Sequence, residues 1–153
     1  MDRMSELRLA ADAKEVAAFL RGNGGSLISG WTVRTEPGPD DEPGVYWLKM
    51  RPKSVPQDQY VARVAWTRYP GAPPSVTFAT KVRGRTDVTN AWPSVAGARP
   101  GNFDFCAAFT AEGYKTHPEW ASQHPWPTTG NPFLWVVQVV QGLLDRHYSG
   151  RAA

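Results

Sequence analysis

Cys106 is the only cysteine of the 153-residue chain, and it lies in the aromatic stretch NFDFCAAFT. A cysteine thiolate is both a nucleophile and a leaving group, so such a residue can carry an acyl group as a thioester. It cannot form an intramolecular disulfide, because the chain has no second cysteine. The alternative is a buried structural cysteine, which packs as a small apolar side chain. Composition alone leaves both interpretations open.

His117 is the candidate partner of this cysteine, in the stretch TAEGYKTHPEW. It follows Cys106 by eleven residues, in a segment that can fold back, and it could act as a base or donate a hydrogen bond to an intermediate. Alternatively, HPEW is a turn in which Trp120 is the anchor and His117 bonds to the backbone. One cysteine and three histidines without short spacing do not form a typical zinc site, so we expect neither metal nor cofactor.

The composition limits the scaffold that can position these residues. Apolar residues make up 41% of the chain and charged residues 20%, which excludes a wholly disordered protein. The 14 prolines and 14 glycines exclude a helical bundle or coiled coil, since both residue types interrupt helices. The length is that of one domain, so we expect residues 1–153 to form a single domain.

Two helices are predicted, one near each end of the chain. In the first, apolar residues recur at helical spacing from Leu9 to Leu20, with Ser5 as the expected cap and Gly22–Gly25 as the end. In the second, Asn131 is the expected cap, Pro132 takes the first helical position, and valines and leucines follow as far as Leu144. This apolar run is too short to cross a membrane, and the first 21 residues mix acids and bases, so we expect a cytoplasmic protein.

Four strands are predicted between these helices, joined by short turns as an antiparallel meander. They are Ser26–Thr35, Val45–Met50, Tyr60–Trp66 and Val76–Thr80. From Val82 to Gly130 there is no sustained period, but seven aromatic residues in this stretch need burial, which predicts a long ordered loop around Cys106. The expected fold class is therefore α+β.

The middle of the chain is basic. Residues 51–100 carry eight lysines and arginines against two aspartates, a local charge of +6, although the net charge of the chain is only +3. Such a segment attracts an acidic partner or nucleic acid, or is simply a solvated face. Nucleic-acid binding is not expected, because these residues follow no helical pattern and form no aromatic platform.

Two segments resemble parts of the ubiquitin-conjugating (E2) enzymes. Residues 60–82, YVARVAWTRYPGAPPSVTFATKV, are similar to the strand, YPxxPPxVxF block and strand of that family. Residues 126–144, WPTTGNPFLWVVQVVQGLL, resemble its tryptophan-proline turn and the helix that follows the active-site cysteine. Trp47 stands where the family often has a tryptophan, and Trp126 is expected to be buried as an anchor. The resemblance covers roughly residues 5–148, and it implies a UBC-like fold.

The resemblance places Cys106 at the catalytic cysteine. It implies a carrier that accepts a ubiquitin-like protein as a thioester and transfers it to an amine. The implied partners are that protein, an activating (E1-like) enzyme and a deubiquitinase-like peptidase, as for minimal bacterial members of the family. The His-Pro-Asn motif that usually supports the oxyanion is absent: AWPSV and ARPGN stand nearest, so Asn102 or Asn90 would have to serve.

Two other functions compete with this one. The same fold can be a non-catalytic module of the E2 or RWD type that binds protein partners, and the missing asparagine motif favours this interpretation. A cysteine hydrolase that uses Cys106 with His117 or His147 is a third hypothesis, although the sequence has no recognisable nucleophile motif for it.

Overall fold

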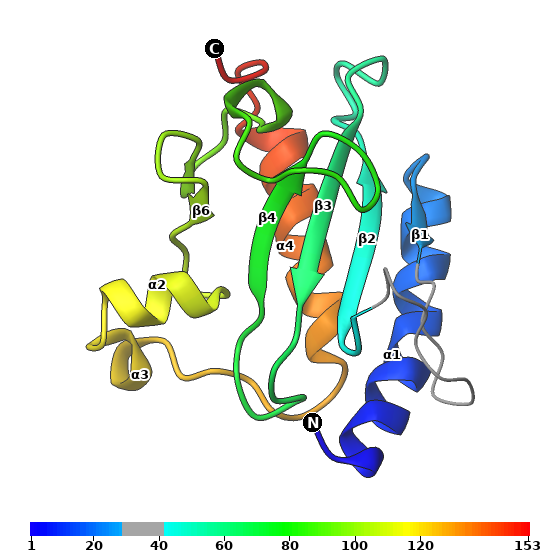
Figure 1. Cartoon of the computed structure of the whole chain (residues 1–153), viewed down its shortest axis with the longest axis vertical. Helices are drawn as coiled ribbons and strands as arrows, with labels where there is room; N and C mark the ends of the chain where they lie inside the picture. The colour runs from blue at the N-terminus through cyan, green and yellow to red at the C-terminus, as the bar shows by residue number, and fades with distance from the viewer. Residues whose placement is uncertain (29–41) are drawn as a thin grey trace.

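The computed structural model describes residues 1–28 and 42–153. Within them, the chain forms an α+β structure with a helix near the N-terminus, a sheet, and a long helix near the C-terminus, as predicted (Figure 1). The first predicted strand begins as expected at Ser26, and β1 covers Ser26–Ile28. Positions 29–35 of that prediction, and the turn expected at 36–41, lie outside the described residues.

The described strands of the main sheet are all antiparallel and follow the chain order β1-β2-β3-β4. β2 is Val45–Met50, β3 is Tyr60–Ala65 and β4 is Ser75–Ala79. The register places Trp47 of β2 opposite Arg63 of β3, and Arg63 opposite Thr77 of β4. The meander predicted from the alternating pattern and the short turns is thus confirmed.

Both predicted helices are present and pack on the same face of the sheet (Figure 1). α1 covers Arg3–Gly22, and its cap is Asp2, whose carboxylate accepts the N–H of Ser5 at 2.9 Å, so the prediction of Ser5 as the cap was wrong. The helix begins three residues earlier than a cap at Ser5 would place it, because the Asp2 carboxylate accepts the N–H of Ser5 and Ser5 is already helical. In the described part of the chain no helix is long and apolar enough to cross a membrane.

α4 covers Pro132–Arg146 and supplies the centre of the core. The side chain of Asn131 accepts the N–H of Leu134 at 2.8 Å, and Pro132 stands in the first turn, as predicted. The ring of Phe133, on the buried face of the helix, lies 5.1 Å from the ring of Tyr46 on the sheet. Burial of this face holds helix and sheet together.

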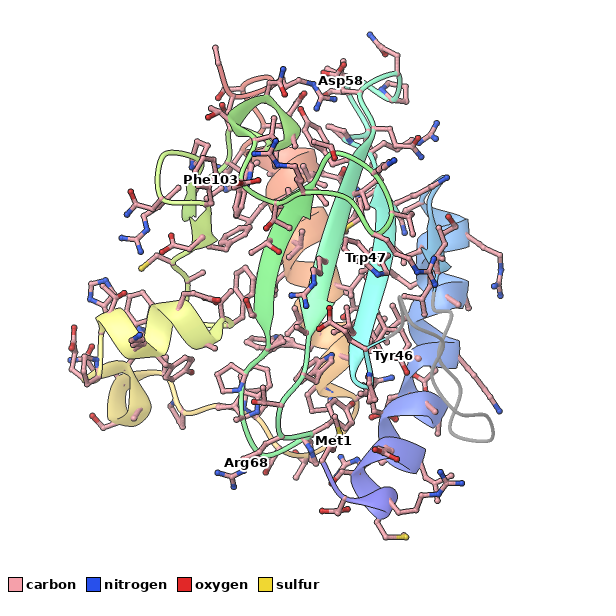
Figure 2. All side chains as sticks on the ribbon, in the orientation of Figure 1. Met1, Tyr46, Trp47, Asp58, Arg68 and Phe103 are labelled. Atoms are coloured by element: carbon pink, nitrogen blue, oxygen red, sulfur yellow. The ribbon has the colours of Figure 1, made fainter. Side chains whose placement is uncertain are left out.

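The sheet has a second apolar face. Alternation along β2 sends Tyr46 toward α4 and Trp47 to the opposite side, where it packs with Val45 and Ala79 (Figure 2). The chain after β4 passes across this opposite face (Figure 1). Both neighbours of Trp47 in the row across the sheet, Ile28 and Arg63, lie on this face as well.

The segment predicted as one long loop contains several short elements. They are the 3-10 turn η1 (Thr89–Ala91), the strands β5 (Ala98–Arg99) and β6 (Asp104–Phe105), and the helices α2 (Ala111–Thr116) and α3 (Trp120–Gln123). The prediction of no regular structure was therefore wrong in detail. Helices of six and four residues are too short to show a 3.6-residue period, which explains why the sequence pattern misses them.

Candidate functional site

The residues before Cys106 fold into a β-hairpin. β5 and β6 pair antiparallel, with Ala98 opposite Phe105. The N–H of Cys106 donates to the carbonyl oxygen of Gly97 at 2.9 Å, which extends the ladder by one residue. Cys106 therefore stands at the end of a strand, held by a backbone hydrogen bond.

Phe105 fixes this hairpin to the core. Its side chain is fully buried, and its ring lies 6.2 Å from Phe78 of β4 and 5.2 Å from Phe109. Aromatic rings at these separations pack favourably and resist displacement. The backbone at Cys106 is thus positioned by core packing on its N-terminal side.

Thr110 ties the chain together on both sides of Cys106. Its hydroxyl is fully buried and donates to the carbonyl oxygen of Phe105 at 2.5 Å, with that of Ala107 at 3.1 Å as a second acceptor. The same oxygen caps α2 by accepting the N–H of Gly113 at 3.1 Å. One buried side chain therefore joins the end of β6, the turn after the cysteine and the start of α2.

The sequence block YPGAPPSVTF forms the support beneath α2. The N–H of Ala111 donates to the carbonyl oxygen of Pro74 at 2.8 Å, and the hydroxyl of Ser75 donates to the carboxylate of Glu112 at 2.5 Å. The first residues of α2 are thereby attached to the proline-rich connection between β3 and β4. The block and the cysteine segment, which are separate in sequence, are joined in space.

Cys106 has a free thiol, and the residue is partly exposed. Arg99 lies nearby and makes a two-pronged ion pair with Asp104, with both N–O distances at 2.6 Å. The hydrogen bond to Asp104 is the main cause that raises the pKa of Arg99, and the charge of Cys106 adds to it.

His117 stands at the end of α2, which runs directly beside the residue after the cysteine. A Cβ placed on Gly113 would lie only 2.0 Å from the carbonyl oxygen of Ala107, so the helix touches the chain there. His117 caps the helix one turn further on, with its Nδ1 3.2 Å from the carboxylate of Glu119 and its ring stacked 4.2 Å from Trp120. Within the described residues, no hydrogen bond joins His117 to Cys106.

The two candidate asparagines lie apart from the cysteine. Asn102 is exposed in the turn of the β5–β6 hairpin, where its N–H donates to the carbonyl oxygen of Arg99 at 2.9 Å. It is thus at the turn end of the hairpin, whereas Cys106 follows the other end of β6. Asn90 lies in η1, and its carbonyl oxygen accepts a hydrogen bond from Arg151 at 2.9 Å. Over residues 1–28 and 42–153, no hydrogen bond joins either side chain to Cys106.

An apolar groove of about 520 Å³ begins two residues after the cysteine, lined by Ala108, Phe109, His124, Pro125, Pro127, Trp135 and Val139. Trp126 lies in sequence between the lining residues Pro125 and Pro127, and its Nε1 donates to the carbonyl oxygen of Pro70 at 2.7 Å. Its ring lies between buried Trp66, 6.1 Å away, and exposed Trp135, 5.6 Å away. Trp126 was expected to be substantially buried, and the structure shows it partly buried and packed against the core.

At least four of the eight basic residues of segment 51–100 form ion pairs with carboxylates. Arg63 pairs with Glu42 at 3.0 Å, and Arg85 pairs with Asp87 at 2.9 Å. Arg99 pairs with Asp104, as described above, and Lys53 lies 4.0 Å from the carboxylate of Asp145. These carboxylates offset part of the positive charge of the segment. This pairing favours the solvated face over a strongly basic binding surface.

Metal binding finds no support in the part of the chain that the structure describes. Over residues 1–28 and 42–153, no three or more histidine, cysteine, aspartate or glutamate side chains are grouped as metal ligands. His117 and His124, the two histidines nearest to the cysteine in sequence, both pack against Trp120.

Sequence reasoning missed the residues that frame the cysteine most closely. The dipeptide Pro100–Gly101 followed by Asn102 is a turn signal, and a hairpin around it would have placed Arg99 opposite Asp104. Thr110 had no such signal, since a single threonine in an irregular segment looks like any other polar residue. Its importance comes from burial, which only the folded structure shows.

No family model matches the chain, and no curated protein or solved structure is significantly similar to it. The site must therefore be interpreted from its own chemistry. That chemistry consists of one accessible thiol at a fixed strand end, a paired arginine beside it, and a histidine–glutamate pair at the end of the adjacent helix.

Proposed function

We propose that this protein is a carrier of the ubiquitin-conjugating type, with a UBC-like fold, which holds a ubiquitin-like protein as a thioester on Cys106. The observation that carries the proposal is the joining of two features first seen in sequence. The partly exposed thiol of Cys106 leads into a helix that is hydrogen-bonded to the YPGAPPSVTF block at Pro74 and Ser75. This frame suits a sulfur that must remain accessible while its backbone stays fixed.

The first transfer is an exchange between two thioesters. The Cys106 thiolate attacks the carbonyl carbon of the carried protein, which arrives as a thioester of the activating enzyme. The new bond from Sγ to carbon forms, the bond to the activating enzyme's sulfur breaks, and that sulfur leaves as a thiolate. The two thioesters have similar energy, so the step needs no unusually strong base. ATP is consumed earlier, when the activating enzyme forms its own thioester.

The second transfer releases the carried protein to an amine. The amine nitrogen attacks the same carbonyl carbon, the oxygen takes up the electron pair, and the pair returns as the bond from carbon to Sγ breaks. Cys106 leaves as a thiolate, and the proton of the amine passes to a base. His117 can be this base: because a carboxylate only accepts, Glu119 fixes the proton on Nδ1 and leaves Nε2 free to accept.

The partners that the proposal requires are a ubiquitin-like protein and an activating (E1-like) enzyme, with a deubiquitinase-like peptidase as a further partner. All three would meet the chain in the cytoplasm, where a single unpaired cysteine stays reduced. The groove beside Ala108 offers a surface for such contacts, but nothing in its shape selects one partner.

A non-catalytic interaction module remains the second candidate. It is favoured by the placement of Asn102 at the far end of the hairpin, since no asparagine stands beside the sulfur to support an oxyanion. An adduct assay separates the two functions. The protein is mixed with its cognate activating enzyme, ubiquitin-like protein and ATP, and the products are compared with and without reductant.

For the carrier, we expect a conjugate that reductant cleaves. Cys106→Ala abolishes it, and Cys106→Ser gives either a reductant-stable oxyester or nothing, because a hydroxyl is a far weaker nucleophile near neutral pH. If the wild-type protein forms no such conjugate with an activating enzyme that charges another acceptor, the interaction module is the better description.

A further inference from the structure

Arg99 and Cys106 lie on one face of the β5–β6 hairpin. Arg99 is opposite Asp104 in the ladder, and Cys106 follows Asp104 by two residues, with its N–H still bonded across the ladder to Gly97. Side chains two apart on a strand point to the same side, and directly opposite residues share that side. Diagonal neighbours are about 7–8 Å apart, which an arginine side chain can span. The register therefore places Arg99 and Cys106 on the same face as diagonal neighbours, with the Asp104 carboxylate that holds the guanidinium on that face too.

Asp104 binds this guanidinium but uses only some of its N–H donors. The ion pair uses Nε, bonded to Oδ1, and Nη2, bonded to Oδ2, each at 2.6 Å. A guanidinium has five N–H donors, and within the described residues Arg99 makes no other hydrogen bond, so both N–H groups of Nη1 remain available. Asp104 therefore fixes the orientation of the guanidinium, and Nη1 can still donate hydrogen bonds to another group.

We propose that Arg99 stabilises the oxyanion that forms during acyl transfer at Cys106, and that Asp104 is its positioning residue. The inference rests on the proposed carrier function. When the thiolate or an amine attacks the thioester, negative charge develops on the carbonyl oxygen, close to the sulfur. The free Nη1 of Arg99 would donate to this oxygen, and the positive charge would also favour departure of Cys106 as a thiolate.

This assignment gives the chain a donor where its sequence lacks the expected asparagine. Asn102 lies in the hairpin turn and Asn90 in η1, outside the two paired strands, whereas Arg99 shares the face of Cys106 in the ladder. The electrostatic effect of Cys106 on Arg99 described above agrees with this placement.

The charge of Arg99 can be tested at the sulfur without any carrier protein. Cys106 is the only thiol, so alkylation by anionic iodoacetate and neutral iodoacetamide reports on this residue alone. The ratio of the two rates should fall about threefold in Arg99→Gln, as expected when a unit charge about 7 Å away in water is lost. Asp104→Asn should raise the ratio, Arg99→Lys should preserve most of it, and high salt should remove the differences.

The matched control is Arg68→Gln. Arg68 is an exposed arginine in the β3–β4 connection, and Figure 2 shows it far from Phe103, which marks the hairpin. Its substitution should leave the ratio unchanged at the same ionic strength. An equal fall in Arg68→Gln and Arg99→Gln would assign the effect to net charge and overturn the local role of Arg99.

The role in transfer is tested on Cys106 charged chemically, by ubiquitin with a C-terminal mercaptoethanesulfonate thioester. Discharge onto free lysine should slow about 100-fold in Arg99→Gln, mainly as a fall in kcat with little change in KM for lysine. Arg99→Lys should recover part of the rate, and Asp104→Asn should fall between. Discharge of Arg99→Gln within twofold of wild type contradicts the proposal.

Failure of the carrier function gives a different result. It appears as the absence of transfer from the activating enzyme, although chemical charging and its dependence on Arg99 persist. A variant that unfolds is recognised by loss of its folded circular-dichroism spectrum, and Arg99→Lys, which keeps the charge, then decides the question.

Discussion

At the scale of single residues, two polar side chains near Cys106, Thr110 and His117, have different roles. Thr110 is fully buried, and its hydroxyl contacts four backbone groups around the cysteine, so its role is structural. His117 is half-exposed and is oriented by the carboxylate of Glu119, so it is placed to take part in proton transfer. Burial and exposure thus separate the side chain that builds the site from the one that would act in it.

His117 is predicted to matter for the second transfer and not for the first. His117→Ala should leave formation of the Cys106 thioester unchanged and slow discharge onto lysine by about 100-fold, the lower end of a general base contribution. Glu119→Gln should have a smaller effect, because the ring keeps its stacking on Trp120. Single-turnover rates measure both steps, with His147→Ala, at the exposed end of α4, as the control. Equal loss in both histidine variants would exclude this role.

At the scale of elements, the β5–β6 hairpin and α2 form a frame around Cys106 that the core holds from below. Gly97 is the close contact nearest to the cysteine: it has a φ of 86°, and a Cβ added there would lie 2.9 Å from the carbonyl oxygen of Cys106. Any side chain at this position must move the cysteine backbone. The position of the Cys106 backbone, and with it that of the sulfur, therefore depends on the absence of a side chain at Gly97.

Gly97→Ala should lower the free energy of unfolding and slow thioester formation together. The control is Gly130→Ala, where φ is also positive, at 70°, but no atom lies within 4 Å of the added Cβ. Both variants should lose about 1–2 kcal/mol from the left-handed backbone, and only Gly97→Ala should lose more and react more slowly. Urea unfolding and the rate of charging measure this. Identical behaviour of the two variants would show that contact at Cys106 is unimportant.

The same elements show what could be predicted from sequence. The two long helices and the strand at Tyr60–Ala65 repeat their apolar residues often enough to reveal their period, and they are present as expected. α2 and α3 span too few residues for any period to emerge. The frame of the site was missed for the same reason, because β5 and β6 have only two residues each.

The candidate residues divide in a similar way. Cys106 could be singled out because it is unique in the sequence, and His117 because histidines are rare in it. Arg99 could not, because it is one of 17 basic residues, and only the register of a two-residue strand pair places it beside the cysteine. Pairing across strands is a property of the folded chain that composition and spacing do not contain.

At the scale of the whole molecule, buried tyrosines link the layers and make the fold sensitive to alkali. Tyr46 lies between sheet and α4, and burial raises its pKa to about 12. Burial also raises the pKa of Tyr69 and Tyr148, and their hydrogen bonds to Asp12 and Asp58 raise it further. In each case the fold favours the neutral phenol over the phenolate.

The free energy of unfolding should therefore fall at alkaline pH. A raised pKa in the folded state contributes stability that is complete below the ordinary tyrosine pKa of about 10 and disappears as pH rises toward 12. Urea unfolding at a series of pH values should show a falling free energy over this window, with a shallower fall in Tyr46→Phe. A free energy that stays constant up to pH 12 in both proteins would contradict the burial of these hydroxyls.

The central claim is that Cys106 carries a ubiquitin-like protein as a thioester, and intact-mass spectrometry of the charged protein tests it most directly. After reaction with activating enzyme, ubiquitin-like protein and ATP, the carrier should gain the mass of the carried protein less one water. The gain should disappear with reductant and should be absent in Cys106→Ala. A wild-type protein that keeps its own mass, beside an activating enzyme shown to be charged in the same mixture, would contradict the claim.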